Sequence, residues 1–185
     1  DPAAITDAYR RRAQFHMFVR EAGQIELQQK TQRRASQAEL ERIGNRIDTH
    51  SVKARECLET ALEKTPEDVE SLVLMGIYWR NTAPKSTDQV ESQREADAYY
   101  LKAKNLYERA IKADPDSFDA YVELQTVYMR DAAAAFNQRD AEGLKENIAK
   151  ASQVLEERIK RGVARTGIHQ FRNRSYMAMI RWRLF

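Results

Sequence analysis

Three histidines and one cysteine are the side chains of this 185-residue chain best suited to bind a metal or to act as a nucleophile. His16, His50 and His169 fall in three different predicted helices, and none has a second ligand one helical turn away, the spacing at which a single helix presents two ligands to zinc. We therefore interpret them as structural residues. Cys57 adjoins Leu58 on an apolar stripe, which favours a packed thiol over a catalytic nucleophile.

No catalytic motif accompanies these residues. The sequence lacks the HExxH, CxxC, GxSxG, P-loop and GxGxxG patterns. Its 28 Asp and Glu residues are spread over predicted solvent-exposed faces, and no pair is singled out for acid–base work. The glycosylation sequon that begins at Asn173 lies inside a predicted helix and carries little weight. We therefore predict a protein that is not an enzyme and that binds no cofactor and no metal.

The composition favours an all-α protein. Glycine and proline are scarce, at six and four residues, and good helix formers such as alanine, glutamate, arginine and leucine dominate. Apolar residues recur three, four or seven positions apart, and no segment alternates as a strand does, so we predict seven helices. One helical face near the N-terminus is formed by Ile5, Ala8, Phe15, Phe18, Ala22 and Ile25.

Local signals mark the expected helix ends. Ser36 and Glu39 have the spacing of a capping box. Thr65, followed by a proline and acidic residues, is predicted to cap the next helix. Asp140 is expected to begin the sixth helix and Gly162 to follow its end, where glycine is favoured in the left-handed conformation.

The charge is unevenly distributed. The whole chain has a net charge of +3, but residues 158–185 contain eight cations and no acid, so the rest of the chain carries −5. This block favours contact with an acidic surface on a neighbouring protein; the alternative is binding of a polyanion, either nucleic acid or anionic lipid. We regard nucleic acid as the less favoured partner.

The compartment is left open by the sequence. No stretch reaches the roughly 18 uninterrupted apolar residues of a membrane span, so we expect a soluble protein without a transmembrane segment. A single cysteine excludes an intramolecular disulfide and fits a reducing compartment. The chain begins at Asp1 without methionine; a processed N-terminus would place it in the periplasm or outside the cell, and otherwise it would be cytoplasmic.

A pattern of small residues, a large residue and a proline occurs twice, 49 positions apart. The first copy contains Ala54, Leu58, Ala61 and Pro66, followed by Leu72, Met75, Gly76 and Trp79. The second contains Ala103, Tyr107, Ala110 and Pro115, followed by Tyr121, Leu124, Gln125 and Tyr128. Small residues let two helices approach closely, an aromatic side chain fills the space between hairpins, and proline ends a helix.

This pattern resembles the tetratricopeptide repeat over residues 54–79 and 103–128. The resemblance implies a single TPR-like helical domain over residues 1–185, an all-α superhelix of about three antiparallel hairpins (residues 3–64, 67–113 and 117–161) with a capping helix over 167–184. The family repeats every 34 residues or so, and the longer period here implies longer helices and loops. A third, partial copy has Arg158 where the others have Ala61 and Ala110.

The resemblance also implies a function in protein–protein interaction, as an adaptor or a structural subunit of a larger assembly. In such a superhelix the first helices of the hairpins line a concave groove for a peptide or partner helix. The matching positions here are Glu70, Val73, Ile77, Arg80, Asp119, Val122, Thr126 and Met129.

The C-terminus is a second predicted contact site. Its last residues combine arginines with apolar anchors that this domain alone would not readily bury, so we predict docking on a neighbouring subunit through Arg181, Trp182, Arg183, Leu184 and Phe185.

Overall fold

The computed structural model describes residues 1–84 and 90–162, with the side chains of residues 90–93 left aside. These residues form six α-helices and no strand, so the all-α prediction is confirmed for them. The helices are α1 (Pro2–Gln32), α2 (Gln37–Lys64), α3 (Val69–Thr82), α4 (Val90–Ala113), α5 (Phe118–Asn137) and α6 (Ala141–Lys160). The predicted seventh helix, over 167–184, lies outside the described residues.

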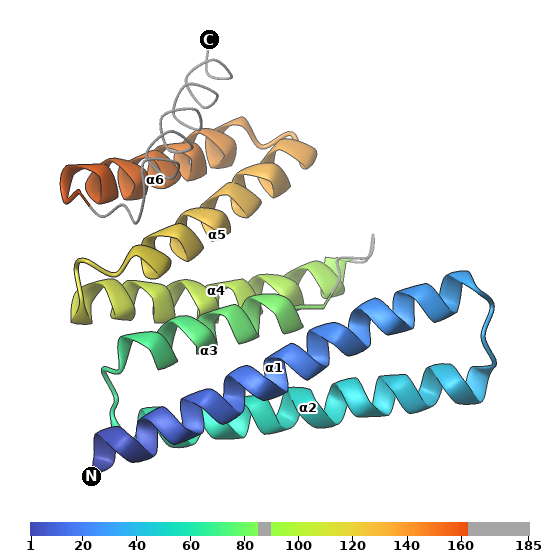
Figure 1. Ribbon diagram of the computed structural model, residues 1–185. Coiled ribbons are helices and arrows are strands. Elements are labelled where there is room, and N and C mark those ends of the chain that lie inside the picture. Colours follow the sequence, from blue (N-terminus) through green and yellow to red (C-terminus); the bar gives the residue numbers. More distant parts are fainter. Residues whose placement is uncertain (85–89, 163–185) are drawn as a thin grey trace.

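The helices pair in chain order. α1 packs along α2, α3 along α4, and α5 along α6, and the three hairpins are stacked one on the next (Figure 1). The predicted packing of helical hairpins is therefore consistent with the structure, whereas the superhelix stays a prediction.

Two turns of the same design connect the hairpins. At the first, the Thr65 N–H donates to the Ala61 carbonyl (2.9 Å) and the Asp68 N–H to the Thr65 carbonyl (3.1 Å). At the second, Asp114 and Ser117 make the corresponding two bonds at 2.9 and 3.1 Å. The second copy of the repeat thus reproduces the geometry of the first.

The start predicted for the third helix was wrong by three residues. Thr65 ends α2, because its N–H still bonds to a carbonyl of that helix. The N-cap of α3 is Asp68, whose carboxylate accepts the Ser71 N–H at 2.9 Å. An aspartate satisfies this otherwise unpaired donor as well as threonine does, and the proline between them lies in the turn.

The other predicted helix ends are confirmed. The Ser36 hydroxyl accepts the Glu39 N–H at 3.4 Å, and the Asp140 carboxylate accepts the Gly143 N–H at 2.9 Å. Gly162 has a φ of +66°, the left-handed conformation that glycine adopts without strain after a helix.

Close helix contacts centre on the small residues of the repeat. Ala54, Ala61, Ala103, Ala110 and Ala151 have no exposed surface. Gly76 of α3 lies against the fully buried ring of Tyr107 in α4, where an added Cβ would come within 2.3 Å of a ring carbon. Trp79 packs against two core clusters, one mainly in α3–α5 and one in α1–α3, and so fills the space between hairpins as predicted.

The apolar face predicted near the N-terminus points away from the core. Ile5, Phe15, Phe18 and Ile25 are exposed, although an apolar helical face ordinarily packs inward. The buried side of α1 is instead formed by Thr6, Ala13, Met17, Arg20 and Gly23. Small and polar residues face the rest of the protein because α2 approaches closely there: an added Cβ on Gly23 would lie 2.8 Å from the Ile47 side chain.

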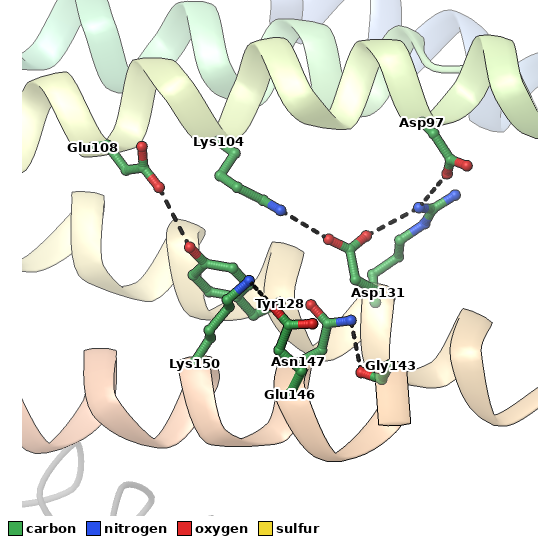
Figure 2. Close-up of polar contacts among 10 residues, drawn as sticks. Asp97, Lys104, Glu108, Tyr128, Asp131, Gly143, Glu146, Asn147 and Lys150 are labelled. Atoms are coloured by element: carbon green, nitrogen blue, oxygen red, sulfur yellow. Dashed lines mark hydrogen bonds and ion pairs between the residues drawn. The ribbon is translucent and has the colours of Figure 1, made fainter. Parts of the chain in front are cut away.

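Polar contacts join the second hairpin to the third (Figure 2). Lys104 of α4 pairs with Asp131 of α5 at 3.1 Å, and Arg130 of α5 pairs with Asp97 of α4 at 2.7 Å. The Tyr128 hydroxyl lies 3.3 Å from a Glu108 carboxylate oxygen. Burial, together with that carboxylate, raises the pKa of Tyr128 to about 12, so the hydroxyl remains a donor at neutral pH.

No helix within residues 1–84 and 90–162 is both long and apolar enough to cross a membrane.

Replacing Ala61 or Ala110 with tryptophan should destabilise the protein strongly. Both positions are fully buried between helices, and overpacking costs about 1–3 kcal/mol or more. Urea unfolding followed by circular dichroism measures the effect. Ala149→Trp, at an exposed position of α6, is the control and should change the free energy of unfolding by no more than about 0.5 kcal/mol. Equal effects at all three positions would contradict the close helix contacts.

Two glycine-to-alanine changes should have opposite signs. Gly76→Ala places a methyl group against the immobile Tyr107 ring, and overpacking of about 1–3 kcal/mol exceeds the helix-propensity gain of about 1 kcal/mol. Gly44→Ala, inside α2 with nothing within 4 Å of the new Cβ, should stabilise by about 1 kcal/mol. Urea unfolding of the two variants compares them, and stabilisation by both would show that α3 and α4 can separate at no cost.

Candidate functional site

Acidic side chains gather where the two matching turns lie side by side. They line an open concavity of about 880 Å³ at one end of the helices, at the left of Figure 1, where α3 and α5 begin and α6 ends. Its carboxylates are Glu67, Asp68, Glu70, Asp114, Asp116 and Asp119. Only two guanidinium groups, those of Arg10 and Arg161, line it with them.

Helix capping explains why these residues are acidic. The N-terminus of a helix carries partial positive charge, so acids in the cap or first turn stabilise it. Asp68 caps α3, and Glu70 and Asp119 occupy the first turns of α3 and α5. Because α3 and α5 are both first helices of their hairpins, they begin at the same end of the stack. Acids that stabilise each helix separately therefore form one acidic surface.

Arg10 of α1 holds one side of the concavity. It donates to both oxygens of Asp68, at 3.1 and 3.2 Å, and its Nε lies 3.1 Å from a Glu70 oxygen. Burial lowers the pKa of Arg10, but the Asp68 and Glu70 carboxylates outweigh that effect and raise it. The guanidinium therefore ties α1 to the start of α3 and compensates part of the acidic charge there.

Val69 and Phe118 supply the apolar part of the lining. Val69 packs against the core, and the Phe118 ring lies 5.1 Å from the guanidinium carbon of Arg158. Arg158, the residue that replaces alanine in the third copy of the repeat, is itself buried, and burial lowers its pKa. The concavity thus has a partly apolar floor and an acidic rim.

The predicted groove residues divide into two groups. Glu70 and Asp119 are exposed and line the concavity. Further along the first helices, Val73 is buried in the core and Ile77 packs against both core clusters. These two apolar residues therefore contribute to packing rather than to an open surface.

The remaining groove residues are held by neighbouring side chains or helices. Arg80 of α3 pairs with Glu123 of α5 at 2.5 Å, across the two hairpins. Burial raises the pKa of Glu123 despite the nearby arginine. Val122 and Met129 are half-buried, and Thr126 is exposed. The predicted docking residues Arg181, Trp182, Arg183, Leu184 and Phe185 lie outside the described part of the chain.

One pair of titratable residues was missed by the sequence reasoning. His16 of α1 and His50 of α2 face each other, with their Nδ1 atoms 2.9 Å apart, and the Phe15 ring lies edge-on to both. One nitrogen must donate and the other accept, so the contact requires at least one neutral ring. Burial lowers the pKa of His16, and the positive charges of Lys53 and Arg12 act in the same direction.

A signal for this pair exists in the sequence. In an antiparallel hairpin, residues at equal distances from the connecting turn lie opposite one another, and His16 and His50 are nearly equidistant from the turn at residues 33–36. Searching for ligands only within one helix overlooks such pairs. Two cationic neighbours disfavour a metal ion here, and no group of three or more possible metal ligands occurs among the residues that the structure describes.

Cys57 has the surroundings of a packed thiol. The side chain is buried in the cluster between α1, α2 and α3. Burial raises the pKa of the thiol, so the reactive thiolate is disfavoured at neutral pH.

Comparison with known proteins adds no family: no protein-family model, no curated protein and no solved structure matches this chain. The likeness to the tetratricopeptide repeat therefore rests on the sequence pattern alone.

The histidine pair should make stability depend on pH. Because the pKa of His16 is lower in the folded protein than its ordinary value of 6.5, the unfolded chain binds the proton more tightly. The free energy of unfolding should therefore fall as the pH is lowered from 6.5 towards the folded-state pKa. His16→Gln should reduce this slope, as measured by urea unfolding at several pH values. Equal slopes in the parent and the variant would show that the pair does not titrate with folding.

Proposed function

We propose that this protein is a non-enzymatic protein–protein interaction module, an adaptor or a structural subunit of a larger assembly, and that its acidic concavity binds a basic segment of a partner protein. The single observation that carries the proposal is the gathering of six carboxylates and two guanidiniums around one open concavity.

The charge of the concavity selects the chemistry of the partner. Glu67, Glu70, Asp116 and Asp119 are all exposed to solvent at the rim. A segment that carries arginine or lysine would replace some of their hydration with charge-assisted hydrogen bonds. Such complementarity steers the encounter and rejects acidic partners, because like charges repel.

The size and floor of the concavity favour a short segment. A volume of about 880 Å³ lies in the range of sites that enclose small ligands or a few side chains. The half-buried surfaces of Val69 and Phe118 offer a place for one apolar anchor between the basic residues. A basic segment with an interspersed apolar side chain therefore fits better than the flat face of a folded domain.

Charge-neutral variants test the proposal. The probe is a short fluorescein-labelled peptide of arginine and leucine, measured by fluorescence anisotropy, with a glutamate–leucine peptide as the negative probe. Three exposed ion pairs at about 0.5 kcal/mol each amount to roughly tenfold in affinity. The triple variant Glu67→Gln, Asp116→Asn, Asp119→Asn should therefore bind the basic peptide roughly tenfold more weakly, and binding to the parent should weaken as salt is added.

The control triple variant is Glu41→Gln, Glu56→Gln, Glu142→Gln. It removes the same charge from exposed positions on α2 and α6 that do not line the concavity, and it should bind as the parent does. Equal weakening by both variants would mean that the peptide senses only net charge, and the concavity would then not be a site. A catalytic turnover that a single substitution abolishes without unfolding the protein would overturn the non-enzymatic assignment.

A further inference from the structure

An exposed stripe on α1 has the periodicity of a second helix-packing seam. We define the outer stripe as Ala8, Arg11, Phe15, Phe18, Ala22 and Ile25, all of them exposed. The spacing alternates between three and four residues, which is the heptad pattern of helices that pair along their length. The stripe extends over about 26 Å of the helix at 1.5 Å per residue.

The stripe is not used by the fold. Ala13, Met17 and Arg20, which face α2 and α3, lie on the opposite side of α1. Phe15 and Phe18 keep 58% and 70% of their surface exposed, which leaves roughly 250 Å² of ring surface in contact with water. Two adjacent phenylalanines on one seam are a contiguous apolar patch, and such patches mark interaction sites.

We infer that the outer stripe binds the same stripe of a second copy of this chain, with the two α1 helices antiparallel. Reversing one helix about the midpoint between residues 16 and 17 places Phe15 opposite Phe18 of the second copy. It also places Ala8 opposite Ile25 and Ala22 opposite Arg11. Each small residue thus meets a large one, and the two rings stack at the centre of the interface, so the stripe complements itself in this register.

The charged member of the stripe supports the antiparallel direction. Arg11 forms an ion pair with Asp7, one turn earlier, at 2.8 Å, so its charge is partly compensated within its own helix. In a parallel pair Arg11 would face Arg11 of the second copy, and like charges would repel. In the antiparallel pair it faces alanine, which leaves room for its aliphatic stem.

This interface is independent of the acidic concavity. The outer stripe shares no residue with the concavity, so a variant of one surface leaves the other intact. The inference therefore goes beyond the proposed binding of a basic segment, and the failure of one does not decide the other.

The first experiment measures the oligomeric state of the full-length chain by sedimentation velocity over a range of concentrations. The parent should form a dimer, and Phe18→Glu should weaken dimerisation at least tenfold without lowering thermal stability, because the ring is exposed. Phe136→Glu is the matched control: Phe136 lies in α5, is equally exposed at 69%, and is not in the stripe. Its substitution should leave the dimer unchanged.

The second experiment tests the direction of the helices by disulfide cross-linking. Ala8→Cys and Ile25→Cys, each mixed with itself, should give no cross-linked dimer, whereas mixing the two variants should give one under mild oxidation. The parent, whose Cys57 is buried, is the background control. Cross-linking of either variant with itself would indicate parallel helices and overturn the antiparallel arrangement.

Three further outcomes would overturn the inference. A parent that sediments as a monomer at all concentrations would exclude a self-associating stripe. Equal loss of dimer in the Phe18 and Phe136 variants would place the interface elsewhere. Binding of a monomeric parent to anionic lipid vesicles that is lost in Phe18→Glu would identify the stripe as a membrane-contact face instead.

Discussion

The close approach of paired helices is the constraint on which the rest of this structure depends. Gly76 lies against the ring of Tyr107 with no room for a Cβ, and fully buried alanines occupy matching positions of α2, α4 and α6. Helices this close bury backbone and β-carbons rather than large side chains. The large residues of the repeat, among them Trp79, are then available to pack between hairpins. The order of the stack follows from this division of roles.

The acidic concavity is a consequence of the same arrangement. Each repeat places its turn and its helix-capping acids at the same end of the stack, so residues that stabilise α3 and α5 individually combine into a charged surface. Stability and binding therefore draw on the same carboxylates. Arg10 shows how the fold limits the resulting repulsion, since it bridges Asp68 and Glu70 while it joins the first hairpin to the second.

α1 shows that an apolar helical face need not be a core face. Its buried side contains Thr6 and Arg20, the latter donating to the Asn81 carbonyl near the end of α3 at 2.6 Å. The polar groups of that side are satisfied by the neighbouring hairpin, so burying them costs little. The phenylalanines are left outside, where only a further partner can remove them from water.

The sequence by itself determined the helices, most of their ends and the repeated contact positions, because caps, turns and periodic small residues act over a few neighbouring residues. Ser36, Asp140 and Gly162 illustrate this, and Thr65 marks its limit, since two nearby residues could each serve as a cap. Only the tertiary structure decided which side of α1 is buried, that His16 meets His50, and that two turns 49 residues apart share one concavity. Those outcomes depend on the rotation of each helix about its axis and on the register between helices, and both are set by the sum of many distant contacts rather than by spacing along the chain.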